Sequence, residues 1–265
     1  MTNSTAMHFE RFGSGRPLVL IHGLGSCWLN WAPILPALAE ERDVIAVDLP
    51  GHGTTAAQTK PSAKVTIASL ADDVTRFLTT EGLETADLVG SSMGARLVLE
   101  LARRGVGGNV VALDPGGFWK AGERRVFATS VGLSVKLVRA LQPWMPAITA
   151  SPIGRTLLMA QFSAHPWRLD PALVLAEMRS FAIATTLDDE LDALAHGPDQ
   201  AGADKTPGRM TIGWGVYDRV TVRSQAARAL DKFPSATLRW FNDCGHFPHW
   251  DQPDAASRFI LRSTS

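Results

Sequence analysis

Leu88-Val89-Gly90-Ser91-Ser92-Met93-Gly94 is the stretch that decides the fold. Its apolar beginning predicts a short strand, and a helix is expected to begin near Ala95. Between them lies the pattern Gly-x-Ser-x-Gly, centred on Ser92. Because strand and helix nearly touch in such a turn, the residues two before and two after the serine must be small, and here they are Gly90 and Gly94.

The same turn predicts a reactive serine. It strains the backbone of Ser92 and lifts the hydroxyl clear of the sheet. The helix that follows offers free backbone N–H groups and a partial positive charge, which would stabilise negative charge developing on a substrate oxygen. The five-residue pattern is common by chance, so the prediction depends on finding a base, an orienting acid and a second oxyanion donor elsewhere in the chain.

The composition is that of an ordinary globular protein. The 265 residues are 45% hydrophobic and 20% charged, which suits one large α/β domain or one domain with an insertion. Lysine plus arginine and aspartate plus glutamate both number 26. The resulting net charge of zero argues against nucleic acid or an anionic membrane as the main partner.

Features that would indicate an oxidising compartment or a membrane are missing from the sequence. The two cysteines, Cys27 and Cys244, do not make a disulfide framework in a chain of this length. No basic region followed by an apolar stretch opens the chain, so we expect no secretory signal. No run of about 18 apolar residues predicts a membrane span. We therefore expect a cytoplasmic protein.

Strand and helix patterns alternate through much of the chain. Apolar runs without alternation, such as Leu18 to Ile21, suit strands that are buried on both faces of a parallel sheet. Their alternation with helical patterns implies a parallel sheet with right-handed crossovers. The predicted strands cover residues 18–21, 43–48, 86–89, 109–113, 209–214 and 236–241, and the predicted helices cover residues 28–40, 67–80, 222–232 and 253–261.

The alternation of strand and helix patterns stops between Asp114 and Lys205. This stretch has no convincing strand, it reads as several helices, and its apolar side chains are bulky. It is far too long for a bare connection in a compact domain, which indicates an inserted helical subdomain. We therefore expect a core made of residues 1–115 and 206–265 and a helical cap or lid made of residues 116–205.

A serine nucleophile needs a base and an acid that orients the base. His246 follows the last predicted strand, and Asp218 follows the strand before it. In a parallel sheet the carboxyl ends of the strands share one edge, so both residues can reach Ser92. The order Ser92, Asp218, His246 is the one expected for this kind of enzyme. Asp114, which follows another predicted strand, is the competing acid.

The second oxyanion donor is expected from the glycine-rich loop that follows the first predicted strand. The backbone N–H of Leu24 is the candidate there, and it is paired with the N–H of Met93, directly after the nucleophile. The alternative is that this loop makes only a tight turn between strand and helix.

Five motifs in this order resemble the α/β-hydrolase fold superfamily, in the branch with a helical cap, and they span nearly the whole chain. They are His22-Gly23-Leu24-Gly25 with Trp31, Asp48-Leu49-Pro50-Gly51-His52-Gly53, Gly90-Ser91-Ser92-Met93-Gly94, Trp214-Gly215-Val216-Tyr217-Asp218-Arg219, and Gly245-His246-Phe247-Pro248.

The resemblance implies an eight-stranded, mostly parallel sheet flanked by helices, with the cap over its active edge. It places the catalytic triad on Ser92, Asp218 and His246 and the oxyanion hole on Leu24 and Met93. One departure is Asp114, where many relatives have a small uncharged residue. This residue is either a second acid near the histidine or a polar contact to the substrate.

These observations predict a serine hydrolase that cleaves a carboxylic ester or lactone with an apolar group. Amide hydrolysis, carbon–carbon bond hydrolysis and perhydrolysis remain alternatives, because they use the same triad, as does a non-hydrolytic ligand-binding protein or lyase. Ser92 argues against epoxide hydrolases and dehalogenases of the superfamily, which carry aspartate at that position. We found no metal-binding or phosphate-binding motif, so no metal and no cofactor is expected.

The expected partner is a small-molecule substrate, and the sequence leaves the oligomeric state open. Bulky side chains in the insertion favour an apolar acyl or alcohol group. The side chains predicted for the substrate pocket are Trp28, Asp114, Trp119, Phe162, Trp167 and Phe247.

Overall fold

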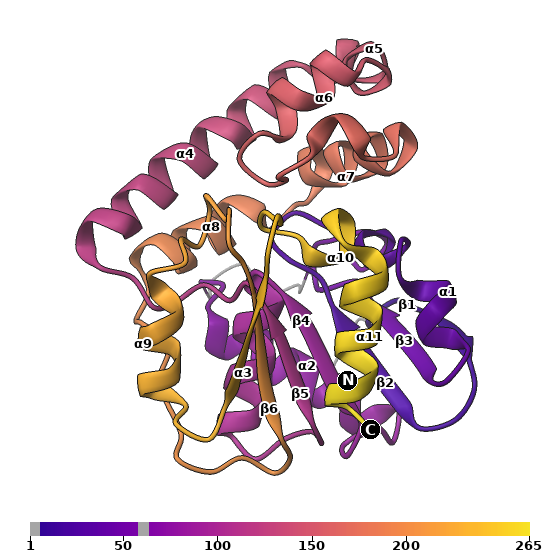
Figure 1. Ribbon diagram of the computed structural model, residues 1–265, viewed down its shortest axis with the longest axis vertical. Coiled ribbons are helices and arrows are strands. Elements are labelled where there is room, and N and C mark those ends of the chain that lie inside the picture. The colour runs from indigo at the N-terminus through magenta and orange to yellow at the C-terminus, as the bar shows by residue number, and fades with distance from the viewer. Residues whose placement is uncertain (1–5, 58–63) are drawn as a thin grey trace.

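The computed structural model describes residues 6–57 and 64–265, and they form an α/β fold around one sheet (Figure 1). Seven strands lie in the order β1-β3-β2-β4-β5-β6-β7, and β1 alone runs antiparallel to its neighbour, β3. The strands are β1 (Phe9–Gly13), β2 (Pro17–Ile21), β3 (Asp43–Val47), β4 (Asp87–Ser91), β5 (Val110–Leu113), β6 (Met210–Gly215) and β7 (Thr237–Phe241).

The expectation of eight strands is wrong for the described part of the chain, which has seven. One strand, β1, precedes β2 there, and it pairs with β3 along its whole length, from Phe9 opposite Val47 to Gly13 opposite Asp43. Gly13 then adopts a φ of 77°, and the chain turns directly into β2. Between β1 and β2 there is no room for a further strand.

Each face of the sheet has its own hydrophobic core. Apolar side chains of α2 (Ile67–Thr80), α3 (Met93–Arg103) and α9 (Gln225–Lys232) pack on one face. Those of α1 (Leu35–Ala39) and α11 (Pro253–Ser263) pack on the other. Helices on both faces explain why β2 to β6 read as continuous apolar runs.

The helix predicted over residues 28–40 is shorter and broken. The chain forms a single 3₁₀ turn, η1 (Trp28–Trp31), and then the short helix α1. Pro33 and Pro36 lie in this stretch and lack the backbone N–H that a continuous helix needs, so one helix cannot cover it. A last short helix, α10 (Pro248–Asp251), leads into α11.

The residues between β5 and β6 are helical, and most of them stand over one end of the sheet (Figure 1). Prolines occupy the first turn of most of these helices, where the missing N–H costs no hydrogen bond. The elements are α4 (Ala121–Ala140), η2 (Gln142–Trp144), α5 (Met145–Ala150), α6 (Pro152–Met159), η3 (Pro166–Arg168), α7 (Pro171–Ile183) and α8 (Leu187–His196).

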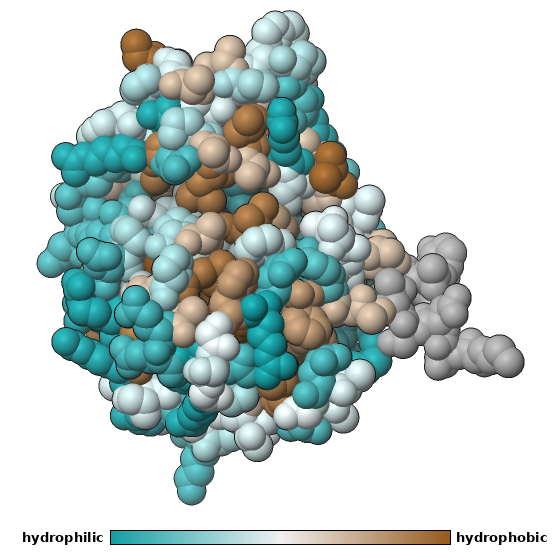
Figure 2. Space-filling model, turned by 90° about the vertical axis from the view of Figure 1, so that its right-hand side faces the viewer, coloured by the Kyte–Doolittle hydropathy of each residue, from teal (hydrophilic) through white to brown (hydrophobic). Residues whose placement is uncertain are grey.

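The outer surface of this helical insertion is partly apolar. Val126, Leu133, Ile153 and Leu157 are each more than half exposed. Figure 2 shows apolar surface in patches down the middle of one face of the molecule, with hydrophilic side chains beside it. In the described part of the chain, none of the helices combines the length and the apolar character needed to cross a lipid bilayer.

The turn between β4 and α3 is as tight as its sequence predicts. Ser92 has a φ of 56°, in the left-handed region that side chains rarely adopt. A Cβ atom on Gly90 would lie 2.1 Å from the carbonyl oxygen of Gly94, and one on Gly94 would lie 2.1 Å from that of Ile21. The helix begins at Met93, two residues before the predicted start, so the serine directly precedes its first turn.

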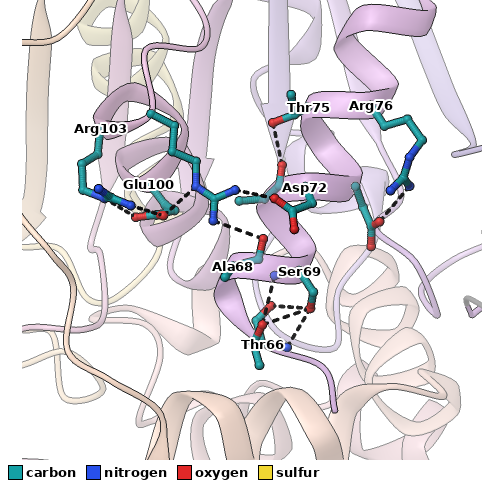
Figure 3. A network of polar contacts seen from close by, with 11 residues as sticks. Thr66, Ala68, Ser69, Asp72, Thr75, Arg76, Glu100 and Arg103 are labelled. Carbon is teal, nitrogen blue, oxygen red and sulfur yellow. Dashed lines mark hydrogen bonds and ion pairs between the residues drawn. The ribbon is translucent and has the colours of Figure 1, made fainter. Parts of the chain in front are cut away.

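Charged side chains anchor the far end of α3 to α2 (Figure 3). Arg104 bonds Asp72 on α2 at 2.6 Å and Glu100 on its own helix at 2.7 Å, and Arg103 adds a second bond to Glu100. Burial raises the pKa of Glu100, but the two arginines outweigh it and lower the pKa to about 2. The helix that carries the serine turn is therefore held at both ends.

The close approach of β4, α3 and β2 at this turn predicts that a glycine-to-alanine substitution destabilises the protein at the turn but not at an exposed helix position. Gly94→Ala is expected to lower the free energy of unfolding by about 3 kcal/mol or more, because the new Cβ would collide with the backbone of β2. Gly122→Ala in the exposed first turn of α4 meets open space and is expected to raise it by up to about 1 kcal/mol. Urea unfolding midpoints of both variants check this, and equal midpoints would contradict it.

Candidate active site

Ser92 and His246 line the same small cavity, whose volume is about 40 Å³. Ser92 stands on the turn before α3, and His246 lies in the loop between β7 and α10. The backbone N–H of His246 donates to the carbonyl oxygen of Phe162 at 2.7 Å, which ties this loop to the helical insertion. Two residues 154 positions apart in the chain are thus brought to one cavity by the sheet topology.

The imidazole of His246 is held by Asp218, in the loop after β6. Nδ1 of His246 lies 2.9 Å from Oδ2 of Asp218, and both side chains are buried. The other carboxylate oxygen accepts backbone N–H groups of Val220 at 2.7 Å and Thr221 at 3.0 Å. The Thr221 hydroxyl donates to Oδ2 at 2.5 Å. Four donors therefore surround the Asp218 carboxylate.

The pKa of Asp218 is lowered although the residue is buried. Burial by itself raises it, but the nearby charge of His246 and the hydrogen bonds from His246 and Thr221 outweigh that effect. Asp218 is therefore ionised at neutral pH. An ionised carboxylate on Nδ1 fixes the tautomer that leaves Nε2 free to accept a proton.

Asp114 lies behind Asp218 and outside the cavity. It directly follows β5 with a φ of 50°, is fully buried, and accepts the Gly215 backbone N–H at 2.8 Å. Its other oxygen, Oδ2, receives no hydrogen-bond donor, and a proton on this carboxyl would be donated to the neighbouring Asp218 carboxylate. Burial and the neighbouring charge of Asp218 raise its pKa well above the usual value. Asp114 is therefore a neutral acid beside an ionised one, and it does not contact the space that a substrate would fill.

Asp114, Asp218 and His246 also bring potential metal-ligand atoms within 4.8 Å of one another. Their facing atoms are already used by the contact between His246 and Asp218. A neutral Asp114 carboxyl is a poor metal ligand, because ligand carboxylates are deprotonated. The cluster is better suited to orienting an imidazole than to holding an ion.

The glycine-rich loop after β2 lies directly against Ser92. A Cβ atom on Gly23 would be 3.2 Å from Cβ of Ser92. Nε2 of His22 accepts the Leu49 backbone N–H at 3.0 Å, so Nδ1 carries the proton and donates to the Gly23 carbonyl oxygen at 2.7 Å. Burial lowers the pKa of His22 well below its usual value, which keeps this neutral tautomer.

That hydrogen bond orients the peptide between Gly23 and Leu24. Because the carbonyl oxygen of Gly23 is held by His22 and by the Ser26 N–H, the N–H of Leu24 points the opposite way. Leu24 lines the cavity with Ser92, and Met93 is the first residue of α3, where backbone N–H groups have no partner within the helix. Leu24 therefore shares the cavity with Ser92, and Met93 directly follows Ser92 in the chain.

Two of the six predicted pocket side chains, Phe162 and Phe247, line the cavity. Asp114, described above, and the three tryptophans are elsewhere. Trp28 packs on Phe12 with ring centroids 5.9 Å apart, and Trp119 packs on Phe127 at 4.7 Å. Trp167 is 46% exposed on the insertion surface. The size of a side chain was not enough to predict which residues line the pocket, because large side chains also fill the interior of the insertion.

The cavity has walls that sequence reasoning missed, and they come from α4, α7 and α8. These residues are Phe127, Val131, Glu177, Phe181 and Leu194. Phe127 and Val131 are one helical turn apart, and so are Glu177 and Phe181, which is the spacing of one helix face. In the sequence, Glu177 is an acidic residue in a largely apolar helical segment. That contrast is the feature from which its place in the cavity wall could have been predicted.

The two acids predict an effect of pH on stability. The pKa of Asp114 is raised in the folded protein, whereas in the unfolded chain this carboxyl loses its proton near the ordinary value of about 3.9. As the pH rises above that value, ionisation favours the unfolded chain, and the free energy of unfolding falls. Asp114→Asn keeps the shape, suits a positive φ and removes this cost. We expect the variant to gain melting temperature over the wild type at pH 7.5 and to lose that gain at pH 4.

Thermal unfolding of both proteins at the two pH values measures the difference. Asp189→Asn removes a carboxylate from an exposed position on α8 and is the matched control, expected to show no such pH-dependent gain. A melting temperature of Asp114→Asn below that of the wild type at pH 7.5 would mean that the native carboxyl is ionised.

Known proteins resemble this chain along most of its length. The dihydrolipoyllysine-residue acetyltransferase component of the acetoin cleaving system of Cupriavidus necator is 29% identical over 261 residues, which cover 93% of this chain and 63% of that protein. The chain therefore spans less than two thirds of that relative. A 2-hydroxymuconate semialdehyde hydrolase of a Pseudomonas species is 28% identical, over 93% of this chain and 85% of that protein.

Solved structures share the fold. The enol-lactonase of Burkholderia xenovorans superposes with a TM-score of 0.74 at 19% identity, over 98% of this chain and 97% of that one. The sequence profile described as the alpha/beta hydrolase family matches residues 18–258. The chain belongs to the alpha/beta hydrolase family.

Proposed function

We propose that the protein is a serine hydrolase that cleaves a carboxylic ester or lactone with an apolar group. Family membership supports hydrolase activity. The observation that carries the finer proposal is the pairing of His246 with Asp218 at 2.9 Å beside a cavity that Ser92 also lines. This is the arrangement that a serine nucleophile requires.

The first half of the reaction forms an ester between substrate and enzyme. Nε2 of His246 takes the proton of the Ser92 hydroxyl while Oγ attacks the carbonyl carbon. The N–H groups of Leu24 and Met93 stabilise the resulting oxyanion. His246 then gives its proton to the departing oxygen, and Asp218 stabilises the imidazole while it is charged.

The second half releases the acyl group. His246 removes a proton from water, the hydroxide attacks the acyl carbonyl, and the Ser92 oxygen leaves with the proton that His246 returns. The same two N–H groups serve the second oxyanion. Residues 116–205 act as the cap in this proposal, because helices of this segment supply much of the apolar cavity wall.

Carbon–carbon bond hydrolysis is the second candidate. Its support is the likeness to the 2-hydroxymuconate semialdehyde hydrolase and to a meta-cleavage product hydrolase of Pseudomonas fluorescens, the latter with a TM-score of 0.72 at 21% identity over 97% of this chain and 93% of that one. Amide hydrolysis and perhydrolysis would use the same residues, so substrate tests have to separate them from ester hydrolysis.

Replacing the proposed nucleophile is the direct test. Ser92→Ala is expected to abolish turnover of 4-nitrophenyl esters of graded chain length and labelling by a fluorophosphonate, without lowering the melting temperature. The reason is that the hydroxyl is the attacking group, whereas the methyl group fits the same turn. Chromogenic assays of wild type and variant check this, and the chain-length optimum measures the acyl pocket.

The outcomes separate the candidates. Equal turnover by Ser92→Ala and wild type would overturn the proposal. Labelling of Ser92 without ester turnover would direct the search to carbon–carbon bonds and amides. Absence of both labelling and turnover would favour a non-hydrolytic ligand-binding protein or lyase.

The two buried acids are expected to differ in their effect on turnover. Asp218→Asn should lower kcat by about four orders of magnitude, because an amide favours the wrong imidazole tautomer. Asp114→Asn should keep most of the turnover, because it replaces a carboxyl that is already neutral. Steady-state kinetics of the two variants on one ester check this pair, and the reverse ranking would make Asp114 the orienting acid.

A further inference from the structure

Glu177 on α7 is the one ionisable side chain of the helical insertion among the residues described as lining the cavity of Ser92 and His246. It is only 5% exposed. Its Oε1 accepts the side-chain N–H of Asn30 at 3.0 Å, whereas Oε2 is buried without a hydrogen-bond partner. A buried polar atom that lacks a partner costs free energy, so a ligand atom that bonded Oε2 would relieve that cost.

The hydrogen bonds behind Glu177 all point toward it. Nε2 of His249 lies 2.7 Å from Oδ1 of Asn30, and burial lowers the pKa of His249 to about 3. The neutral imidazole therefore donates to Asn30, whose side-chain N–H donates to Glu177. This relay holds Oε1 of Glu177 against the core, while Oε2 makes no hydrogen bond and belongs to a side chain that lines the cavity.

Glu177 also borders a second cavity of about 60 Å³, which shares Leu24, Phe162, Phe181 and Phe247 with the first. The two spaces are therefore adjacent, and their shared walls are aromatic and aliphatic. None of the described residues that line either cavity is Lys or Arg. A carboxylate on a substrate would find no cation there and would meet the Glu177 carboxyl instead.

We propose that Glu177 determines substrate specificity: its free oxygen accepts a hydrogen bond from a neutral donor group of the substrate, a hydroxyl or an amide N–H, and the site rejects substrates that carry a carboxylate there. This inference rests on the proposed function and names the substrate class. The donor group must lie within a few bonds of the scissile carbonyl, because Ser92 and Glu177 border one small cavity.

The ionisation of Glu177 gives the proposal a distinctive pH dependence. Burial raises its pKa, and hydrogen bonding by the Ser26 and Asn30 side chains and the charge of His52 reduce that effect, which leaves the pKa at about 7. Rejection of a carboxylate should therefore strengthen as the pH rises from 6 to 8. Below pH 7 the protonated acid can donate to an anion, so the discrimination weakens.

Other titrating groups near Glu177 can be distinguished from it. His249 stays neutral above its pKa of about 3, and burial raises the pKa of Cys27 to about 12. Burial lowers the pKa of His52, but the charge and hydrogen bonding of Glu190 outweigh it and raise the pKa overall. Glu177→Gln keeps His52, so a pH dependence that persists in this variant would belong to His52. His246 takes part in the turnover of every substrate, so its contribution is common to two substrates measured at one pH.

The experiment compares three 4-nitrophenyl esters with acyl chains of equal length, ending in isopropyl, primary carboxamide or carboxylate. The ends are of similar size, and the last two are both planar but differ in charge and in the N–H donor. We expect wild-type kcat/KM at pH 8 to favour the carboxamide over the carboxylate by about 100-fold and over the isopropyl ester by about tenfold. The first ratio should fall as the pH is lowered to 6.

Two variants separate specificity from a structural role. Glu177→Gln keeps the shape and the contact to Asn30 and should make the ratio of carboxamide to carboxylate independent of pH. Glu177→Leu removes the acceptor and should abolish the preference for the carboxamide over isopropyl. Asp189→Asn, which removes an exposed carboxylate of the same insertion, should leave all ratios at wild-type values.

A binding measurement keeps this inference distinct from the proposed function. Calorimetric titration of Ser92→Ala with the three corresponding methyl ketones should give the same ranking of affinities. Preference in binding without any ester turnover would overturn the proposed function and retain the role of Glu177. Turnover with equal ratios for wild type, Glu177→Gln and Glu177→Leu would overturn the role of Glu177 and retain the hydrolase.

Discussion

The contact between β4 and α3 is the constraint on which the rest of the site depends. Gly90 and Gly94 allow strand and helix to approach so closely that either position has no space for a Cβ atom. The same approach forces Ser92 to a φ of 56° and puts the first turn of α3 directly behind it. Position, exposure and electrostatic environment of the serine thus have one physical cause.

Around that turn, two buried acids are kept in different protonation states. Asp218 has four hydrogen-bond donors and is ionised, whereas Asp114 receives one backbone N–H and is neutral. Two adjacent negative charges in a site without solvent would repel each other, so the one with more donors keeps the charge. The loop after β6 therefore supplies the donors that keep Asp218, the acid in contact with His246, ionised.

The sequence predicted the parts of the molecule that short motifs determine. The turn at Ser92, the loop positions of Asp218 and His246 and the parallel sheet follow from local patterns and from the geometry of strand ends. The number of strands was wrong, because it came from the resemblance and not from these residues. The triad roles remain a proposal, and so does the cap, although the insertion is helical as expected.

The pocket could not be predicted in the same way, because it depends on how the insertion packs on the core. The sequence of α7 is largely apolar, but it shows neither which face is buried nor that Glu177 meets Asn30 from the glycine loop. A second polar link joins the residue before α8 to the loop after β3, where the hydroxyl of Thr186 donates to the carbonyl oxygen of Pro50 at 3.1 Å. Removing the side chain of Glu177 or of Thr186 would leave a buried polar group of the core without its partner, so these contacts help to fix the insertion relative to the core. Buried polar contacts therefore fix the position of α7 beside the cavity of Ser92. The apolar side chains of the insertion contribute buried surface, which stabilises the packing but does not select one position.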